Sequence, residues 1–321
     1  MTVLEISSKL MSEISLICKD YNITKVKDIL NYNLRGGKLT RYQILSHVAN
    51  NGNEKVTEFD KDIVGFIIEA FHASFLMSDD IVDNSTMRRD KPCFYFRRKM
   101  MTLRDSRFLI SLIYQLIKRL NLKIKKVIEK CFFETCLGQT IDTKNKVRDE
   151  CSFSLYKRIC ELKTSSYTVY MPMACGYILG GRKCPDYLEE FTNIIGLIYQ
   201  MNDDYLNFFP EKTKKSFTDL EEFKLTYFTS KLGDCFKEVQ ELAAMEKNEE
   251  ELDVKEFNKD LDMFFNKKAV PASIEKWIRS YFDKYFIHKE ELVMKSRDMI
   301  HKEDEKDLFF LYDILKKYEL K

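Results

Sequence analysis

Long apolar stretches with helical spacing follow one another through most of the chain. Residues 1–30 carry apolar side chains at roughly every third or fourth position, which predicts one or two amphipathic helices. Residues 63–77 are apolar on nearly all sides, a pattern typical of a buried helix. Further apolar helical stretches occupy residues 108–120, 127–137, 155–179 and 191–201. The sequence therefore predicts an all-α protein.

The scarcity of helix-breaking residues supports this fold class. Only 10 glycines and 5 prolines occur in 321 residues, and the first proline is Pro92. Residues 246–260 are highly charged and predict a surface connection, followed by helices from about residue 271, near 289–308 and at 308–320. Because no Pro/Ser-rich linker divides the chain, we expect one domain over residues 1–321.

Charge, cysteine and histidine content argue against several classes of protein. The 53 lysines and arginines nearly balance the 51 aspartates and glutamates, so we expect no nucleic-acid partner. The nine cysteines form no CxxC pair and we recognise no signal peptide, so we expect reduced thiols in a cytoplasmic protein. The four histidines lack the spacing of zinc ligands, and no run of 18 apolar residues predicts a membrane span.

Three aspartates follow directly on the most apolar of the predicted helices. Asp79, Asp80 and Asp83 stand at i, i+1 and i+4, so Asp79 and Asp83 project from one side of a helix. Carboxylates this close stay ionised readily only when a cation lies between them, and Mg²⁺ binds through one or two carboxylates plus substrate phosphates. Arg88 and Arg89 supply charged forks for phosphate oxygens. The cluster indicates a diphosphate site, and the alternative is a solvated helix end of mixed charge.

A second apolar stretch ends in the same way. Residues 191–201 run into Asp203 and Asp204, and Asn207 lies four positions after Asp203. Two buried helices that both end in acids form a more specific signal than one, and they could hold one metal cluster from opposite sides of a cavity. Asp142, in the segment GQTID, is either a helix cap or a further metal ligand.

Cations recur around both acidic clusters. Lys38 and Arg41 follow a Gly-Gly pair and lie on one side of a new helical turn, as phosphate ligands or as ordinary surface cations. Lys163 lies in an apolar stretch, so it needs an anionic partner or must extend its amine to solvent. Lys215 and Lys224 follow the second acidic cluster.

Six segments in order resemble the trans-isoprenyl diphosphate synthases, most closely the farnesyl diphosphate synthases of eukaryotes: GGKLTR, DDIVDNSTMRR, GQTID, KT, NDDYLN and KKSFTDLEEFK. Each segment alone is a weak signal, but six in order with compatible spacing are specific. The resemblance runs from about Leu30 to the C-terminus. It implies a single bundle of long helices around a deep central cavity, a homodimer, and a cluster of Mg²⁺ ions between the two aspartate-rich motifs.

The resemblance also implies a role for each matching position. The metal ligands are Asp79, Asp83, Asp142 and Asp203, supported by Asp80, Asp204 and, through water, Asp219. The isopentenyl diphosphate is held by Lys38, Arg41, His72 and Arg89. The allylic diphosphate is held by Arg88, Lys163, Lys215 and Lys224. Beside the reacting carbons lie Thr164, Tyr167 and Gln200.

The implied activity is the Mg²⁺-dependent head-to-tail condensation of isopentenyl diphosphate with dimethylallyl or geranyl diphosphate. The product is farnesyl diphosphate, a precursor in sterol and other isoprenoid synthesis. Two alternatives within the same fold are a non-catalytic regulatory subunit and a terpene cyclase. A cyclase needs no second diphosphate site, so the retained Lys38, Arg41 and Arg89 argue against it. The surviving cations likewise argue against a subunit without activity.

Two departures from the family pattern affect metal binding and product length. Asn207 stands where the family usually has aspartate, so we expect weaker metal affinity rather than inactivity. Phe75 and Ser74 precede Asp79 by four and five positions, toward the floor of the implied cavity. The ring of Phe75 favours a fifteen-carbon product, whereas the small Ser74 leaves space for a twenty-carbon one, geranylgeranyl diphosphate.

Overall fold

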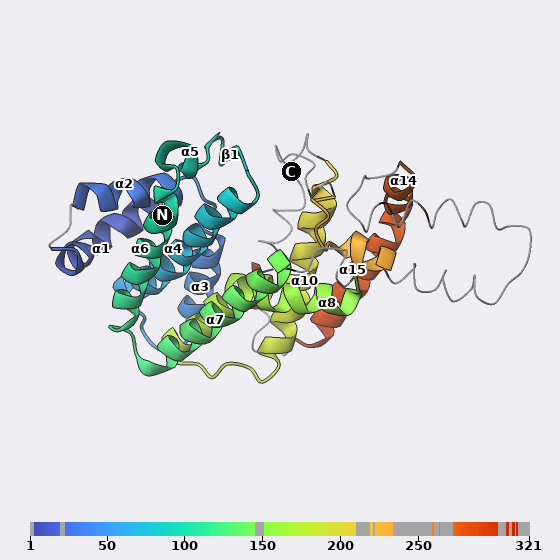
Figure 1. Cartoon of the computed structure of the whole chain (residues 1–321). Coiled ribbons are helices and arrows are strands. Elements are labelled where there is room, and N and C mark those ends of the chain that lie inside the picture. Colours follow the sequence, from blue (N-terminus) through green and yellow to red (C-terminus); the bar gives the residue numbers. More distant parts are fainter. Residues whose placement is uncertain are drawn as a thin grey trace, which may run out of the picture. The chain divides into compact units, whose positions relative to one another are not determined.

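The computed structural model describes the chain at residues 3–19, 23–144, 151–209, 219–220, 222–233, 259, 263, 272–300, 306–307, 310–311 and 313. Within these residues the regular structure is helical except for two strands of two residues each, which confirms the predicted all-α class (Figure 1). The chain forms two compact units. Unit 1 comprises Met1–Lys130 and Met171–Asp186, and unit 2 comprises Cys131–Tyr170 and Tyr187–Lys321. The single domain over the whole chain stays a prediction.

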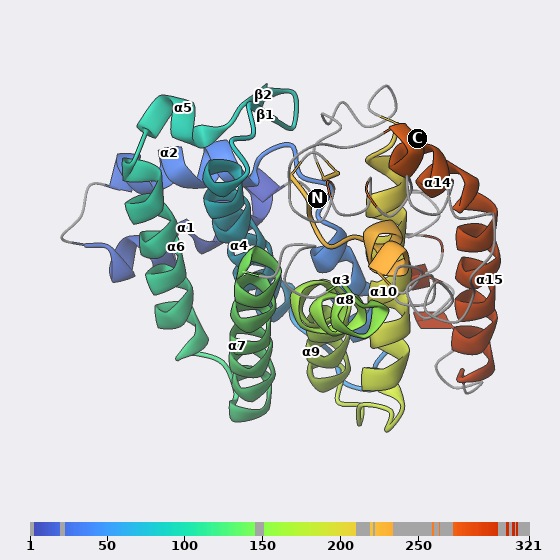
Figure 2. The same ribbon diagram turned by 45° about the vertical axis from the view of Figure 1, so that its right-hand side comes forward.

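Unit 1 is built around one long helix, α4. Its elements are α1 (Val3–Ile17), α2 (Ile23–Leu34), α3 (Thr40–Asn50), α4 (Glu58–Val82), β1 (Met87–Arg88), β2 (Lys91–Pro92), α5 (Phe94–Arg98), α6 (Met101–Ile117), the start of α7 (Leu122–Lys144), and α9 (Met171–Leu179). Helix α4 packs against α1, α2, α3, α5, α6 and α9, and Figure 2 shows it between α6 and α3. Because neighbours surround it, every residue from Lys61 to Phe71 is buried, as its apolar sequence predicts.

The start of α4 is fixed by its own sequence. The hydroxyl of Thr57 accepts a hydrogen bond from the backbone N–H of Asp60 (3.1 Å), the usual arrangement at a helix N-terminus. Glu58 and Asp60 place negative charge in the first turn, where the helix dipole favours it. The predicted acidic cluster lies at the opposite, C-terminal end of α4.

Unit 2 is built around α10 (Leu188–Leu206). Its other elements are the end of α7, α8 (Phe153–Ile159), the π-helix η1 (Cys160–Tyr170), α14 (Ala272–Ser280) and α15 (Phe282–Asp298). Helix α10 packs against η1 and α15, and α15 runs beside it in Figures 1 and 2. The rings of Tyr205 on α10 and Tyr285 on α15 stack with centroids 5.0 Å apart. This aromatic contact anchors α15 to the helix that carries the second acidic cluster.

The predicted helix near residues 289–308 was wrong in its bounds. Helix α15 begins at Phe282 and ends at Asp298, because its first turns bury Tyr285 in the aromatic core. The helix predicted from about residue 271 is confirmed as α14. The charged connection at 246–260 and the C-terminal stretch at 308–320 lie almost wholly outside the described residues.

The stretch 155–179 is not one α-helix, as its pattern suggests, but three consecutive helical segments. Between α8 and α9 the chain forms η1, a π-helix of 11 residues. This segment carries three predicted site residues, Lys163, Thr164 and Tyr167. Because π-helical segments are rare and occur mostly at functional sites, the unusual backbone itself marks this position.

Two glycines allow the neighbouring helices of unit 2 to approach η1 closely. A Cβ atom on Gly196 of α10 would lie 2.0 Å from Ser165 Oγ and 2.6 Å from Ser165 Cα. A Cβ on Gly138 of α7 would lie 2.6 Å from the backbone nitrogen of Lys163. Neither position has room for a side chain, so these contacts fix where η1 lies within the unit.

We expect Gly196→Ala to destabilise the protein. In an open helix this change stabilises by about 1 kcal/mol, whereas here it forces η1 away from α10, and overpacking of a well-packed contact costs about 1–3 kcal/mol. Thermal unfolding followed by circular dichroism should show a midpoint several degrees lower. As a control, Glu190→Ala on the exposed side of α10 removes only a surface ion pair to Lys295 and should change the midpoint little. An unchanged midpoint for Gly196→Ala would contradict the close approach.

Candidate active site

The acidic end of α4 separates its three aspartates into two environments. The backbone N–H of Asp83, the C-cap, donates to the carbonyl of Asp79 (2.8 Å), so these two residues lie one turn apart. Both are partly exposed. Asp80 is buried at 4% exposure. Asp79 and Asp83 therefore lie one turn apart, as the spacing predicts, and are partly accessible to solvent, whereas Asp80 is buried.

Asp80 forms an ion pair with Arg88 of β1. The Nε atom of Arg88 lies 3.0 Å from Asp80 Oδ1, and one terminal nitrogen of Arg88 lies 2.5 Å from the same oxygen. Arg89 and Asp90 form the turn between β1 and β2, and both have positive φ angles, as type I′ hairpins require. Asp80 thus holds the Arg88 guanidinium beside the acidic end of α4. Its supporting role in metal binding stays a prediction.

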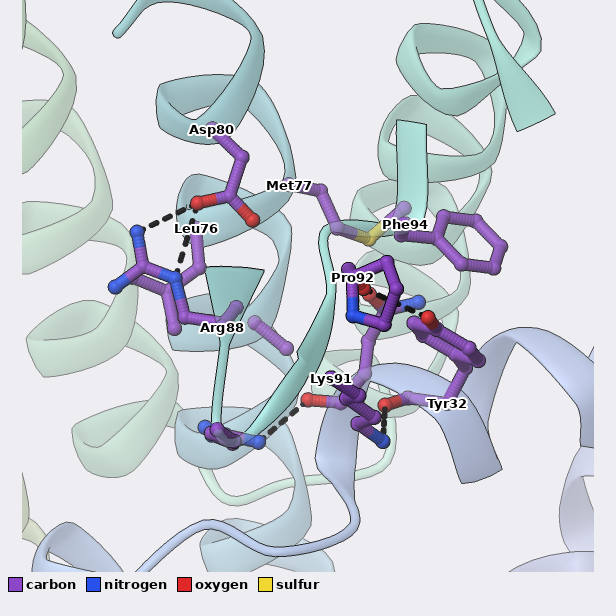
Figure 3. A pocket seen from close by; sticks show the side chains of 11 residues that line it. Tyr32, Leu76, Met77, Asp80, Arg88, Lys91, Pro92 and Phe94 are labelled. Atoms are coloured by element: carbon purple, nitrogen blue, oxygen red, sulfur yellow. Dashed lines mark hydrogen bonds and ion pairs between the residues drawn. The ribbon is translucent and has the colours of Figure 1, made fainter. Parts of the chain in front are cut away.

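The hairpin is fastened to α2 around a small hollow (Figure 3). The Tyr32 hydroxyl donates to the carbonyl of Pro92 (2.7 Å), and the Lys91 amine donates to the carbonyl of Tyr32 (2.7 Å). One terminal nitrogen of Arg89 donates to the carbonyl of Asn33 (2.7 Å). These three bonds attach the hairpin that carries Arg88 to α2 and hold the side chain of Arg89 directly.

All four residues implied to hold the isopentenyl diphosphate belong to unit 1, and three of them lie close together. The Arg89 guanidinium lies against Gly37 of the GGKLTR motif, where an added Cβ would meet its nitrogen at 2.9 Å. Arg41 is buried at 8% exposure, and its charge and that of Arg89 act on His72. Burial and these cations hold the pKa of His72 well below its usual range. Lys38, the third residue of this motif, is exposed.

A buried acid that the sequence reasoning missed balances these cations. Glu69 of α4 accepts a hydrogen bond from the backbone N–H of Tyr42 (3.1 Å). Burial raises the pKa of the Glu69 carboxyl, and the nearby Arg41 and that hydrogen bond oppose the rise. An acid inside an otherwise apolar stretch is the signal that could have identified it.

In unit 2, Asp142 and Lys163 form an ion pair. The amine of Lys163 lies 2.5 Å from Asp142 Oδ2. The prediction that Lys163 needs an anionic partner is confirmed. Asp142 lies inside α7, which ends at Lys144, so the alternative of Asp142 as a helix cap was wrong. Its role as a metal ligand stays a prediction.

The end of α10 mirrors the end of α4. Asp203 is partly exposed, whereas Asp204 is buried at 3% exposure and bonded to the side chain of Gln200 (2.9 Å). Gln200 in turn accepts from the Thr164 hydroxyl (2.8 Å), which joins two predicted site residues. Burial and the nearby charge of Asp219 raise the pKa of Asp204 to about 7. Tyr167, on the same π-helix as Thr164, is partly exposed.

The segment after α10 supplies one predicted cation within the described residues. Lys224 lies 3.4 Å from Asp219 and 3.0 Å from Glu222. Asn207 is buried and its side-chain oxygen accepts from the backbone N–H of Asp219 (3.4 Å). An uncharged acceptor thus occupies this position, and its effect on metal affinity stays a prediction. Lys215 lies outside the described residues.

The two residues predicted to set product length differ in their surroundings. The ring of Phe75 packs edge-on against Phe71 with centroids 4.6 Å apart, and it is partly exposed. Ser74 is buried, with its hydroxyl bonded to the carbonyl of Phe71 (2.7 Å) and its own carbonyl bonded to Ser106 of α6 (2.9 Å). Phe75 is therefore oriented by a ring one turn before it.

The carboxylates suit Mg²⁺ bound together with a phosphate ligand. No group of three or more histidine, cysteine, aspartate or glutamate side chains gathers in a metal-ligand arrangement in the part of the chain that the structure describes. Mg²⁺ needs no such group, because it keeps water ligands and is held by one or two carboxylates plus substrate phosphates. Asp79 and Asp83 in unit 1 and Asp203 in unit 2 supply such donors, and a shared cluster between them stays a prediction. No described helix is long and apolar enough to cross a bilayer.

The lowered pKa of His72 predicts a pH dependence of stability. The folded chain keeps His72 neutral where the unfolded chain, with an ordinary pKa of 6.5, takes up a proton. Above pH 6.5 both the folded and the unfolded chain keep His72 neutral, so His72 does not affect the free energy of unfolding. As the pH falls below 6.5, protonation of the unfolded chain lowers the free energy of unfolding by up to about 1.4 kcal/mol per pH unit. His72→Gln removes this effect, so the free energy of unfolding in urea should fall less between pH 7 and 5 in the variant. Equal slopes in the two proteins would contradict this.

Comparison with known proteins agrees with this arrangement. The sequence profile of the polyprenyl synthetase family matches residues 23–261. Farnesyl pyrophosphate synthase 2 of Arabidopsis thaliana is 33% identical over 235 residues, 65% of this chain and 68% of the relative. Farnesyl pyrophosphate synthase 2 of Cannabis sativa is 30% identical over 254 residues, 71% and 73% of the two chains.

The fold agrees as well. The structure of T. brucei farnesyl diphosphate synthase complexed with risedronate superposes with a TM-score of 0.74 at 19% identity, covering 99% of this chain and 98% of that one. At this identity the likeness supports the fold alone, and it confirms the helical isoprenoid synthase fold that the motifs implied. With the profile spanning most of its length and these relatives, the chain belongs to the polyprenyl synthetase family.

Proposed function

We propose that this chain is a Mg²⁺-dependent farnesyl diphosphate synthase, which condenses isopentenyl diphosphate with dimethylallyl and then geranyl diphosphate. The observation that carries the proposal is the cluster of Arg41, His72 and Arg89 against the GGKLTR loop. Chain extension needs a site for a second diphosphate beside the acidic site, and this cluster supplies it. The cluster also favours this reaction over a terpene cyclase.

The isopentenyl diphosphate binds to this cluster through charge-assisted hydrogen bonds. Arg41 and Arg89 present guanidinium groups that stay charged at all working pH values. His72 is neutral, because burial and the neighbouring arginines lower its pKa, so it contributes a hydrogen bond rather than a charge. Lys38 adds an exposed amine at the edge of the same loop.

The allylic diphosphate binds to cations that form ion pairs with carboxylates of the chain. Arg88 is held by Asp80 and Lys163 by Asp142, so both lie in defined positions before substrate arrives. Lys215 and Lys224 complete the set. Asp79, Asp83, Asp142 and Asp203 would hold Mg²⁺, which when bound neutralises the diphosphate and makes it a better leaving group.

The remaining polar groups act on the carbon skeleton. Departure of the diphosphate leaves an allylic cation, which the oxygens of Thr164 and Gln200 stabilise, with Tyr167 beside them. The double bond of isopentenyl diphosphate attacks this cation, forming the new carbon–carbon bond, and the proton lost from the adjacent carbon goes to the released diphosphate. The apolar helices exclude water, which would otherwise capture the cation.

The homodimer and the cytoplasmic location are part of the same proposal. Both rest on membership of the family. Among the relatives, farnesyl pyrophosphate synthase 1 of Arabidopsis thaliana is named as mitochondrial. Size-exclusion chromatography with light scattering measures the dimer directly, and fluorescence microscopy of a tagged chain measures the location.

One assay tests the reaction class. Purified protein is incubated with Mg²⁺ and geranyl diphosphate, with and without isopentenyl diphosphate, and the products are separated by chromatography after dephosphorylation. We expect farnesol only when isopentenyl diphosphate is present. Cyclic hydrocarbon released without it would indicate a cyclase, and no product under either condition would indicate a non-catalytic subunit.

The same assay tests the acidic end of α4. Asp79→Ala should lower kcat by about a hundredfold or more, because it removes a ligand of the proposed Mg²⁺, and Mg²⁺ would neutralise the charge of the leaving diphosphate. Asp60→Ala, at the exposed start of the same helix, is the matched control and should keep wild-type kcat. A near-normal rate for Asp79→Ala would remove this residue from the mechanism.

Product length tests the role of Phe75. Because its ring is braced by Phe71, Phe75→Ala opens the space beside Ser74 and should make twenty-carbon or longer chains the main product. Phe59→Ala changes a ring that is 44% exposed near the start of the same helix and should leave the products unchanged. Unchanged products for Phe75→Ala would place the floor of the cavity elsewhere.

A further inference from the structure

A chain of hydrogen bonds in unit 2 links a buried carboxylate to a residue beside the proposed reacting carbons. The Thr164 hydroxyl donates to Gln200 Oε1 (2.8 Å), and Gln200 Nε2 donates to Asp204 Oδ1 (2.9 Å). The second oxygen, Asp204 Oδ2, accepts from the Tyr156 hydroxyl (2.8 Å) and from the backbone N–H of Tyr227 (2.8 Å). Asp204 is 3% exposed, and each of its oxygens accepts a hydrogen bond from the protein.

The carboxylate of Asp204 fixes the direction of both hydrogen bonds that link it to Thr164 through Gln200. Asp204 Oδ1 accepts the hydrogen bond from Gln200 Nε2, so Gln200 presents its NH₂ group to Asp204. The amide oxygen of Gln200 then faces Thr164 and accepts from its hydroxyl. Thr164 has one hydroxyl proton and uses it in this bond, so its oxygen offers only lone pairs to any other neighbour.

This direction matters where positive charge develops. A lone pair aimed at an allylic cation lowers its energy, whereas an O–H group with its proton toward the cation raises it. In a site from which water is excluded, neither effect is screened. A hydroxyl that is free to rotate would have to reorient when the diphosphate departs, and a hydroxyl already fixed as an acceptor does not.

We propose that Asp204 is a positioning residue, which acts through Gln200 to fix the Thr164 hydroxyl with its oxygen lone pairs toward the allylic cation. This role rests on the proposed function. The proposal also gives different roles to the two neighbouring aspartates of the NDDYLN motif. Asp203 is the partly exposed metal ligand, and Asp204 is committed to three protein donors.

The test replaces Asp204 by its neutral isostere. In Asp204→Asn the amide oxygen satisfies Tyr156 and Tyr227, so the new NH₂ group faces Gln200. The Gln200 amide must then turn over and donate to Thr164, which releases the Thr164 proton. With geranyl and isopentenyl diphosphates as substrates, kcat should fall ten- to a hundredfold. KM for both substrates should change less than threefold.

A double-mutant cycle distinguishes this role from a purely structural one. Thr164→Val removes the hydroxyl, so Asp204→Asn should lower kcat at least threefold less in the valine background than in the threonine background, because only the effect on the Gln200 oxygen remains. In a Thr164→Ser background, which keeps the hydroxyl, Asp204→Asn should again cost ten- to a hundredfold. Equal losses in the threonine and valine backgrounds would overturn the proposal.

Two further variants keep the test decisive. Tyr156→Phe removes one donor to Asp204 but leaves the bond to Gln200, so kcat should stay within threefold of wild type. Should Asp204→Asn not fold by circular dichroism, Asp204→Ser takes its place in the cycle with Thr164→Val, since it removes the same acceptor of the Gln200 amide. If the effects of these two substitutions on kcat are fully additive, the proposal is overturned. A smaller effect in the valine background supports it.

The outcomes also distinguish this role from the function on which it rests. A wild-type chain that forms farnesyl diphosphate while Asp204→Asn keeps wild-type kcat overturns the positioning role alone. A wild-type chain that extends no allylic diphosphate overturns the proposed function, and the positioning role with it.

Discussion

Charge compensation inside helical surroundings is the constraint on which the site depends. Cations and acids that leave bulk water must find each other, because an isolated charge is strongly disfavoured there. Arg88 is paired with Asp80, and Lys163 with Asp142. In both pairs the carboxylate holds the cation where the proposed allylic diphosphate would later bind. Asp80 and Asp142 thus fix the positions of two cations that the proposed function uses as phosphate ligands.

Much of the fold could be predicted because the apolar sequences of α4 and α10 indicate that both helices are buried. A helix surrounded by neighbours must be apolar on all sides, and residues 63–77 show that pattern without ambiguity. The acids that end both helices stand out for the same reason. Membership of the family followed from short motifs in a fixed order, which the family profile and the relatives support.

What the sequence could not predict depends on hydrogen bonds and on contacts between segments. The π-helix at Cys160–Tyr170 is defined by i→i+5 backbone hydrogen bonds in place of i→i+4 bonds, and the sequence pattern does not indicate which of the two forms. The pairing of Asp142 with Lys163 joins positions 21 residues apart, and nothing local in the sequence indicates it. Asp203 and Asp204 look equivalent in the motif, and only the burial of Asp204 against Tyr156 and Tyr227 distinguishes them.

The turn between β1 and β2 has a consequence for how tightly the diphosphate of the proposed function would be bound. Arg89 has a φ angle of 54°, an uncommon conformation for a residue with a side chain, and its guanidinium is tied to the carbonyl of Asn33. A free arginine on a surface loses much rotamer entropy when it closes on an anion, which weakens binding. Arg89 loses that freedom when the chain folds. Preorganisation of this kind trades some stability of the empty protein for affinity toward the ligand.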